Sequence, residues 1–461
     1  AIFILAFCLA VYFAQKGYIL EEICFAPRTS CLLYRNFALL IASSCICAVP
    51  LIYIIISSIM EGTMLYFNCL AIIYFIFRWL SLLLVSETLG FLIGTLRKNT
   101  YVYLLAAPFS IIFSHLNEYF LFLFFKEDKL IAISNLLSLQ EPLIHGVDID
   151  YSGARVDLLF AMKCVFTLIF TLLIVVVTII VAQKRFAFNT VIALCSCLIV
   201  LPVLGRLYVS IFPKVYSYED KLYITDDRSA GYMILSYEGD IRLSEYSDFK
   251  CIVTVKKGIG DLTLRLDETL KIHELTLEGR KIKYIRSGDF IVIPENEIPN
   301  MNSFSVGLLY GGRVQYRSDV DSINIYTSWF SSALPPNFAF IPIVDGDLSE
   351  KDYNFSVKCA NALISNLTVE AGDVYTVSGR SNTFCLFCGF LTQFEKEGII
   401  FYRAKYNKAT DYWVEYQSAL TRYSFDPYTC EFENLSTKPR KVFMIYYLYG
   451  IFGYPVVFDD Y

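Results

Sequence analysis

Long apolar segments fill most of the first 212 residues, and they constrain the fold more than any other feature of the sequence. A helix needs about 20 mostly apolar residues to cross a bilayer, and a soluble bundle would need polar faces between such helices. Six segments follow or approach this pattern: Ala1–Ala14, Phe37–Ile59, Leu65–Gly94, Tyr101–Phe125, Leu158–Ala182 and Thr190–Phe212. The sequence therefore predicts a polytopic α-helical membrane domain with six spans over residues 1–212.

The first of these segments is shorter than the others. Ala1–Ala14 is apolar from its first residue, carries no charged leader and is too short to cross a bilayer. We therefore expect a span whose beginning lies upstream of Ala1, in a chain that is truncated there. The sequence leaves open whether the chain is also truncated after Tyr461.

The remaining residues have a different composition and a different period. Residues 213–461 carry 26 Lys and Arg and 33 Asp and Glu, against 13 and 11 in residues 1–212. This dispersed acidic charge argues against nucleic-acid binding. Leu262, Leu264 and Leu266 alternate with polar residues, and short β-rich runs recur up to about Phe432. We expect an all-β domain, a sandwich or saddle, over residues 213–461, with a C-terminal helix at Pro439–Phe452.

The loops between the apolar segments differ in basic residues, which concentrate on the cytoplasmic side of membrane proteins. Seven lie after the first, third and fifth segments: Lys16, Arg28, Arg35, Arg97, Lys98, Lys184 and Arg185. Three lie after the second and fourth: Lys126, Lys129 and Arg155. We therefore expect a multi-pass plasma-membrane protein whose β-rich domain lies outside the cytoplasm.

The segment between the first two spans, Gly17–Arg35, combines an acidic pair, a hydrophobic turn, a proline, Thr and Ser, and a basic residue. In this order it resembles the coupling loop of type-2 ABC exporter permeases, which docks onto the ATPase. Ser86–Gly94 and Leu116–Asp157 are similar to later parts of that family's membrane domain. The resemblance covers about residues 1–186, and a generic polytopic protein is the alternative.

That resemblance implies partners as well as a fold. The residues expected at the ATPase contact are Glu21, Glu22, Pro27, Arg28 and Arg35. The chain has no Walker A motif, so ATP would bind a cytoplasmic ABC ATPase subunit and no cofactor would bind this chain. A second permease half, in a homodimer or heterodimer, and membrane lipid are the other expected partners.

Several ionisable residues fall inside the apolar segments, where a charge is expensive unless it is paired or hydrated. The four most interesting as intramembrane polar candidates are Arg78, Glu87, His115 and Glu118. His115 and Glu118 are three residues apart and share a helix face, but two ligands do not make a metal site. The structural alternative is that all four form polar contacts that hold the bundle together.

The β-rich half carries a second resemblance. Leu262–Gly279 and Gly288–Ile293, followed by Ala360–Asn366, Thr383–Phe390 and Tyr447–Pro455, resemble in their order the N-terminal β-saddle domain of aminopeptidase N-like metallopeptidases. The zinc chemistry of that family needs an H-E-x-x-H motif on a helix. The chain has three histidines, and none begins this motif. We therefore predict no metal, no catalytic residue and no enzymatic activity in this chain.

The cysteines give no clear disulfide pattern. Cys385 and Cys388 form a C-x-x-C, but it lies in an apolar run typical of a strand, where residues three apart point to opposite faces. We expect them to be core cysteines that cannot hold one metal ion together.

Three functions follow from these observations. The first is the permease subunit of an exporter that moves a peptide, a lipid or another amphiphile outward, with the β-rich domain binding substrate or a partner. The second is a membrane-anchored aminopeptidase-like protein whose zinc domain is missing here. The third is a receptor or scaffold that does not transport.

Overall fold

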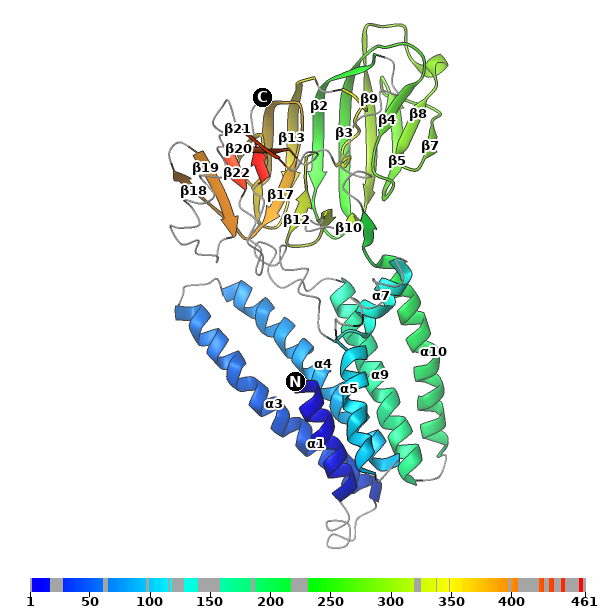
Figure 1. Ribbon diagram of the computed structural model, residues 1–461. Coiled ribbons are helices and arrows are strands. Elements are labelled where there is room, and N and C mark those ends of the chain that lie inside the picture. Colours follow the sequence, from blue (N-terminus) through cyan, green and yellow to red (C-terminus); the bar gives the residue numbers. More distant parts are fainter. Residues whose placement is uncertain are drawn as a thin grey trace. The chain divides into compact units, whose positions relative to one another are not determined.

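The computed structural model contains two compact units that meet in sequence at Phe212 and Pro213 (Figure 1). Helices make up the first unit and strands the second. The structure describes residues 2–16, 28–60, 65–96, 99–114, 117, 128–139, 158–183, 187–216, 231–318, 325–336, 338–347, 349–396, 399–404, 423–426, 431–434, 441–443 and 456–458.

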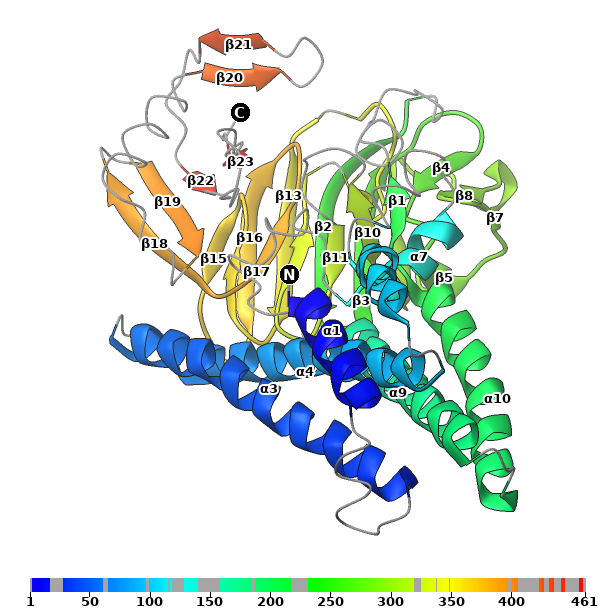
Figure 2. The same ribbon diagram turned by 60° about the horizontal axis from the view of Figure 1, so that its bottom comes forward.

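The described part of the helical unit contains seven α-helices and one 3₁₀-helix, and each helix follows an apolar segment of the sequence or flanks one. They are α1 (Ile2–Lys16), α3 (Arg28–Met60), α4 (Leu65–Leu96), η1 (Thr100–Leu105), α5 (Ala106–Ile112), α7 (Asp128–Leu137), α9 (Leu158–Gln183) and α10 (Phe188–Ile211). Helices α9 and α10 run side by side in both views (Figures 1 and 2).

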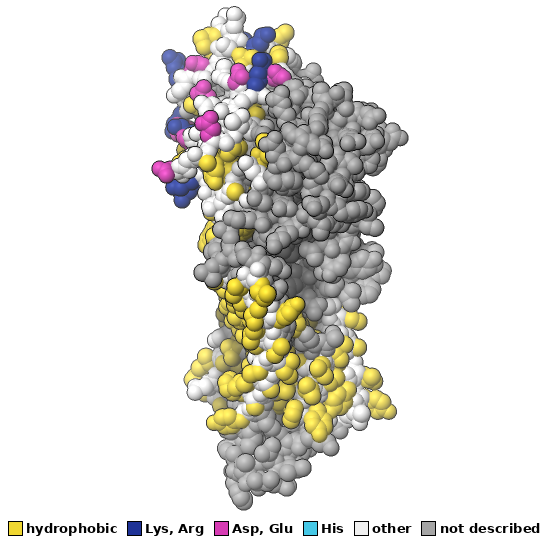
Figure 3. All heavy atoms as spheres, turned by 90° about the vertical axis from the view of Figure 1, so that its left-hand side faces the viewer, with side chains coloured by type: hydrophobic (Ala, Val, Ile, Leu, Met, Phe, Trp, Pro, Cys, Tyr) yellow, Lys and Arg dark blue, Asp and Glu magenta, His cyan; other side chains and the backbone are white. Residues whose placement is uncertain are grey.

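Three of the described helices are long and apolar enough to cross a membrane. The segments are Trp79–Leu96 in α4, Leu158–Ala182 in α9 and Phe188–Ile211 in α10. Hydrophobic side chains cover the described surface of the helical unit, whereas the described charged side chains in this view lie over the β-rich unit (Figure 3). Their length, their composition and this apolar surface support an association with a membrane.

The expectation of six spans is not supported. Helix α1 has 15 residues, or about 22 Å at 1.5 Å per residue, against a hydrocarbon core of about 30 Å. In α3 the described apolar stretch, Phe37–Tyr53, is also shorter than a span.

The fourth expected span, Tyr101–Phe125, is not a continuous helix in its described part. A 3₁₀-helix passes into α5, which ends at Ile112. Pro108 lies in the first turn of α5 and lacks the N–H that would continue an α-helix from η1. After Ile112 the chain turns, and the carbonyl of Phe113 accepts a hydrogen bond of 2.9 Å from the amide of Leu139.

Helices α1 and α4 approach each other through small residues. A Cβ atom on Gly90 would lie 2.5 Å from the carbonyl oxygen of Phe7 and 2.8 Å from the Cβ of Ala10. A Cβ atom on Gly94 would lie 2.8 Å from the Cβ of Ala14. Small residues four apart on both helices let the two backbones touch, which is a common way to pack helices where the surroundings are apolar.

The β-rich unit contains two large sheets. The eight-stranded sheet has the order β15 (Thr368–Glu370), β16 (Tyr375–Ser381), β13 (Lys351–Lys358), β2 (Met233–Arg242), β3 (Ser247–Lys256), β9 (Ser303–Gly312), β5 (Leu270–Leu277) and β6 (Arg280–Lys281). The six-stranded sheet has the order β1 (Lys214–Tyr216), β10 (Gln315–Ser318), β11 (Ile325–Thr327), β12 (Ser332–Leu334), β17 (Leu386–Gly389) and β14 (Ala362–Ile364). Pairing is antiparallel except between β13 and β2 and between β1 and β10.

Both sheets contribute to one hydrophobic core. Strand β3 buries every second residue, Ser247 through Val255, and leaves the others at the opposite face, as expected for a sheet with one face in water. Aromatic side chains fill the centre: the rings of Phe249 and Tyr310 stack with their centroids 5.0 Å apart. Buried residues of β10, β12 and β17 belong to the same cluster.

Smaller sheets complete the unit. One is a three-stranded sheet of β4 (Leu262–Arg265), β8 (Phe290–Ile293) and β7 (Ile285–Ser287). Another is a four-stranded sheet of β18 (Leu391–Lys396), β19 (Ile399–Ala404), β22 (Lys441–Phe443) and β23 (Val456–Phe458). The last is a hairpin of β20 (Tyr423–Asp426) and β21 (Glu431–Asn434). The expected C-terminal helix is wrong where the structure describes it, because Lys441–Phe443 is strand β22, paired with β19 and β23.

Candidate functional site in the helical unit

Helix α4 is the most enclosed of the three spanning helices. Of its spanning segment 61% is buried, compared with 22% for α9 and 6% for α10. The enclosed part contains three consecutive buried polar residues, Ser86, Glu87 and Thr88. Polar groups in apolar surroundings are costly unless they are satisfied, so this segment is the first place to look for a functional site.

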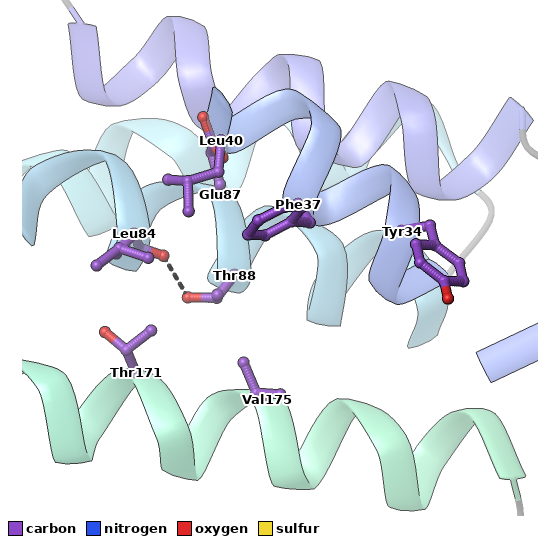
Figure 4. Close-up of a pocket in the computed structure, with 8 residues that line it drawn as sticks. All are labelled: Tyr34, Phe37, Leu40, Leu84, Glu87, Thr88, Thr171 and Val175. Carbon is purple, nitrogen blue, oxygen red and sulfur yellow. Dashed lines mark hydrogen bonds between the residues drawn. The ribbon is translucent and has the colours of Figure 1, made fainter. Parts of the chain in front are cut away.

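A pocket of about 340 Å³ opens between α3, α4 and α9 (Figure 4). Its volume lies in the range of small-molecule sites, about 300–1,000 Å³. Eight described residues line it, and none of these is Lys, Arg or His: Tyr34, Phe37 and Leu40 from α3, Leu84, Glu87 and Thr88 from α4, and Thr171 and Val175 from α9.

Glu87 is the only acidic residue among the described residues of the lining. Its side chain is 1% exposed. Within the described structure, neither carboxylate oxygen accepts a hydrogen bond of normal length and angle. The Ser43 hydroxyl, on α3, is the polar group that approaches this carboxylate. Glu87 is therefore a buried acid in an apolar pocket that is approached by one hydroxyl and, among the described lining residues, by no basic side chain.

Two threonines add acceptor atoms to the pocket. Thr88 donates its hydroxyl proton to the carbonyl of Leu84 at 2.6 Å, the bond drawn in Figure 4. Thr171, on the facing helix α9, donates to the carbonyl of Thr167 at 2.8 Å. Because each hydroxyl proton is used within its own helix, the oxygen lone pairs are what these side chains can offer to a ligand.

The polar groups around Glu87 thus favour a ligand that donates hydrogen bonds or carries positive charge. The Tyr34 hydroxyl points away from Glu87 in Figure 4, and the Phe37 ring lies between the two. Aromatic faces attract cations, and the leucine and valine side chains favour an apolar body. The pocket is chemically suited to a proton or to a cation with an apolar part.

A second polar cluster connects α7, α9 and α10. The Asn135 Oδ1, on α7, accepts a hydrogen bond of 2.8 Å from the hydroxyl of Tyr208 on α10 and one of 3.4 Å from Lys163 Nζ on α9. This cluster fixes the packing of α7 against the two spanning helices. In the sequence, Lys163 and Asn135 stand out only as polar residues within apolar runs.

The structure describes the side chain of one sequence-predicted site residue, Glu87. Arg28 and Arg35 lie in α3 and Arg78 lies in α4, while their side chains are outside the described part. The remaining predicted residues, in the coupling segment and near the fourth span, lie outside the described residues: Glu21, Glu22, Pro27, His115 and Glu118. Sequence reasoning missed the other seven lining residues, because aromatic, aliphatic and threonine side chains are ordinary in apolar helices.

Comparison with known proteins gives limited similarity. No family model matches the chain, and no curated protein matches it. One solved structure that resembles it is an M1 zinc metallopeptidase of Deinococcus radiodurans, with 10% identity and a TM-score of 0.33 over 50% of this chain and 59% of that chain. Another is aminopeptidase A of Legionella pneumophila, with 17% identity and a TM-score of 0.31 over 40% of this chain and 25% of that chain. A third is yeast LTA4 hydrolase, with 12% identity and a TM-score of 0.29 over 37% of this chain and 31% of that chain.

The chain covers less than two thirds of each of these proteins, and similarity at this level does not place it in their family. No family model supports the resemblance to an exporter permease. The expectation that this chain is not an enzyme is corrected, because the solved structures that resemble it are those of enzymes. Within the described residues, no group of three or more His, Cys, Asp or Glu could hold a metal ion.

Proposed function

We propose that this chain is an integral membrane protein whose helical unit binds an amphiphilic cation at Glu87. One observation carries the proposal: a carboxylate that is 1% exposed lines an apolar pocket and has no geometrically satisfied hydrogen bond within the described structure. A lone buried charge is unfavourable, and a bound cation would offset that cost. The apolar and aromatic lining would hold the rest of the ligand.

Movement of that ligand across the membrane is the role we propose for the pocket. Helix α3 begins at Arg28, within the segment expected to contact an ATPase, and the same helix lines the pocket with Tyr34 and Phe37. A displacement of that segment would therefore reach the site through one continuous helix. In this proposal the chain is a permease subunit that works with a separate ABC ATPase, a second permease half and membrane lipid.

The orientation belongs to the same proposal. The bias of Lys and Arg toward alternate loops supports a plasma-membrane protein with residues 213–461 outside the cytoplasm. The β-rich unit would then bind substrate or a partner there, and its outer sheet face, polar along β3, suits contact with water.

A second candidate is a membrane-anchored aminopeptidase-like protein. The observation that favours it is that strands β4, β5 and β8 occupy the segments that resemble a β-saddle domain in sequence, Leu262–Gly279 and Gly288–Ile293. In that case the β-rich unit would hold peptides or a catalytic domain, and Glu87 would have no part in ligand binding.

The two candidates are distinguished by ligand charge. The full chain in lipid nanodiscs is titrated with tetraphenylphosphonium and with tetraphenylborate, a cation and an anion of nearly the same shape, and empty nanodiscs give the lipid background. The proposal predicts saturable binding of the cation and none of the anion. Equal binding of both ions, or binding to lipid alone, would contradict it. Binding of free-amine peptides that a Glu87→Gln substitution leaves unchanged would favour the second candidate.

A further inference from the structure

Two cysteines that are far apart in sequence meet in the β-rich unit. Cys359 follows the last residue of β13, and Cys388 lies in β17. Both thiols approach the backbone carbonyl oxygen of Asn361, at 3.2 Å from the Sγ of Cys359 and 3.7 Å from the Sγ of Cys388. The two side chains are also close enough for each to shift the pKa of the other. Two thiols that share one acceptor oxygen lie near each other, and a disulfide needs two cysteines whose side chains lie close together.

The two thiols have different environments. Cys388 is 2% exposed, and the hydrogen bond with Cys359 followed by burial raises its pKa well above that of an ordinary thiol. Cys359 is partly exposed, and the hydrogen bond with Cys388 lowers its pKa. Because the thiolate is the reactive form, Cys359 is the thiol that reacts first with a reagent from solution.

We propose that Cys359 and Cys388 are a reversible thiol–disulfide pair that reacts with disulfide oxidants. The Cys359 thiolate attacks one sulfur of an external disulfide, forms a mixed disulfide and releases one thiolate. The Cys388 thiol then loses its proton and attacks the Cys359 sulfur, which releases the second thiol. The protein loses two electrons and two protons, and the external disulfide is reduced to two thiols.

The bond would connect the two large sheets. Cys359 is next to β13 of the eight-stranded sheet, and Cys388 lies in β17 of the six-stranded sheet. The C-x-x-C cysteines, by contrast, do not form the pair: the Sγ of Cys385 lies 3.4 Å from the Oδ1 of Asn366. Oxidation would therefore restrain the connection between the sheets, and it would leave Cys385 as a thiol.

The test uses the full chain in detergent, first reduced and then equilibrated with mixtures of reduced and oxidised glutathione. Remaining thiols are blocked with iodoacetamide, and mass spectrometry of peptides locates each modification. The proposal predicts a peptide pair linked through Cys359 and Cys388, whose share rises with oxidised glutathione and returns to zero on reduction. Glutathione on Cys359 without the link, or no oxidation at either position, would overturn it.

Three variants separate the roles of the cysteines. Cys388→Ala should leave Cys359 as a stable mixed disulfide with glutathione and should slow its alkylation at pH 7 several-fold, because the hydrogen bond that lowers its pKa is lost. Cys359→Ala should leave the buried Cys388 unmodified. Cys385→Ala is the matched control and should leave the link unchanged. If Cys385→Ala abolished the link as Cys359→Ala does, the assignment of the pair would be wrong.

Discussion

The hydroxyl of Tyr316 lies 3.0 and 2.9 Å from the two carboxylate oxygens of Asp267, inside the β-rich unit. Asp267 is 1% exposed and also accepts a hydrogen bond of 3.0 Å from the amide of Thr269. One buried carboxylate thereby connects the turn after β4 to strand β10. Unlike Glu87, Asp267 has the hydrogen bonds that make a buried acid tolerable in a protein core.

Replacing Tyr316 by Phe should destabilise the β-rich unit, because the Asp267 carboxylate would lose a hydrogen bond without gaining water. Hydrogen bonds to a charged group contribute about 1.5–3 kcal/mol, and we expect a loss of this size. Hydrogen exchange of peptides from β10, followed by mass spectrometry, gives the free energy of opening. Tyr246→Phe is the control and should change it less, because Tyr246 is 48% exposed and its hydroxyl donates one long hydrogen bond, of 3.3 Å, to the neutral carbonyl of Gly311. Equal effects of the two substitutions would contradict this account.

Alkaline pH should destabilise the same unit. Burial is the main cause that raises the pKa of Tyr237, Tyr310 and Tyr316 above the ordinary value near 10. Above that value the unfolded chain loses tyrosine protons that the folded chain keeps, so the free energy of unfolding falls as pH rises. The expected slope is about 1.4 kcal/mol per pH unit for each such tyrosine.

Chemical unfolding measured from pH 8 to 11.5 would show this loss beginning near pH 10. Tyr237→Phe removes one titrating group and should make the slope shallower, even if it lowers stability at pH 8. Two results would show that the buried tyrosines do not cause the loss of stability. One is a pH slope of the unfolding free energy in Tyr237→Phe equal to that of the wild type, and the other is a stability that does not change with pH above 10.

Close packing of α1 on α4 should make Gly90 intolerant of even a methyl group. Gly90→Ala would place a Cβ atom 2.5 Å from the carbonyl oxygen of Phe7, and a backbone atom cannot move aside as a flexible side chain can. Gly205→Ala, in α10, is the matched control because its nearest atom, in Leu136, is 3.8 Å away. Alanine favours a helix by about 1 kcal/mol over glycine, so the control should be neutral or stabilising. Thermal unfolding in detergent compares the two, and a melting temperature for Gly90→Ala as high as that of Gly205→Ala would contradict the packing.

The ligand-free helical unit should become more stable when Glu87 is replaced by Leu. An unsatisfied buried polar group costs about 1–3 kcal/mol, and leucine has a similar size without that cost. Thr88→Val is the control: its hydroxyl is already bonded to Leu84, so its removal should not raise the melting temperature. A lower melting temperature for Glu87→Leu than for the wild type would mean that the carboxylate has a stabilising partner.

The sequence predicts the β-rich unit better than the helical one. Alternation at Leu262, Leu264 and Leu266 correctly indicates buried positions, the first two of them in strand β4, because a period of two is a local property. The expected six spans are not supported, because total apolar length does not show where a helix stops. In the fourth segment, Pro108 and the turn at Phe113 interrupt the helix.

The sites depend on contacts that no local pattern shows. Glu87 was identified from the sequence because an acid in an apolar run is unusual, whereas Thr171, which lines the same pocket from another helix, carries no such signal. Similarly, the C-x-x-C spacing drew attention to Cys385, although Cys359 is the cysteine that shares the Asn361 carbonyl oxygen with Cys388, where β14 pairs with β17. Partners that are distant in sequence become visible only in the fold.

The affinity of the nanodisc-embedded chain for tetraphenylphosphonium, measured by equilibrium dialysis in the wild type and in Glu87→Gln, tests the central claim most directly. Glutamine keeps the size of the side chain and removes the charge, so the account predicts that Kd rises at least about tenfold, which corresponds to about 1.4 kcal/mol. Thermal unfolding checks that the variant is folded. An unchanged Kd in a folded Glu87→Gln variant would show that Glu87 does not bind the cation and would contradict the account.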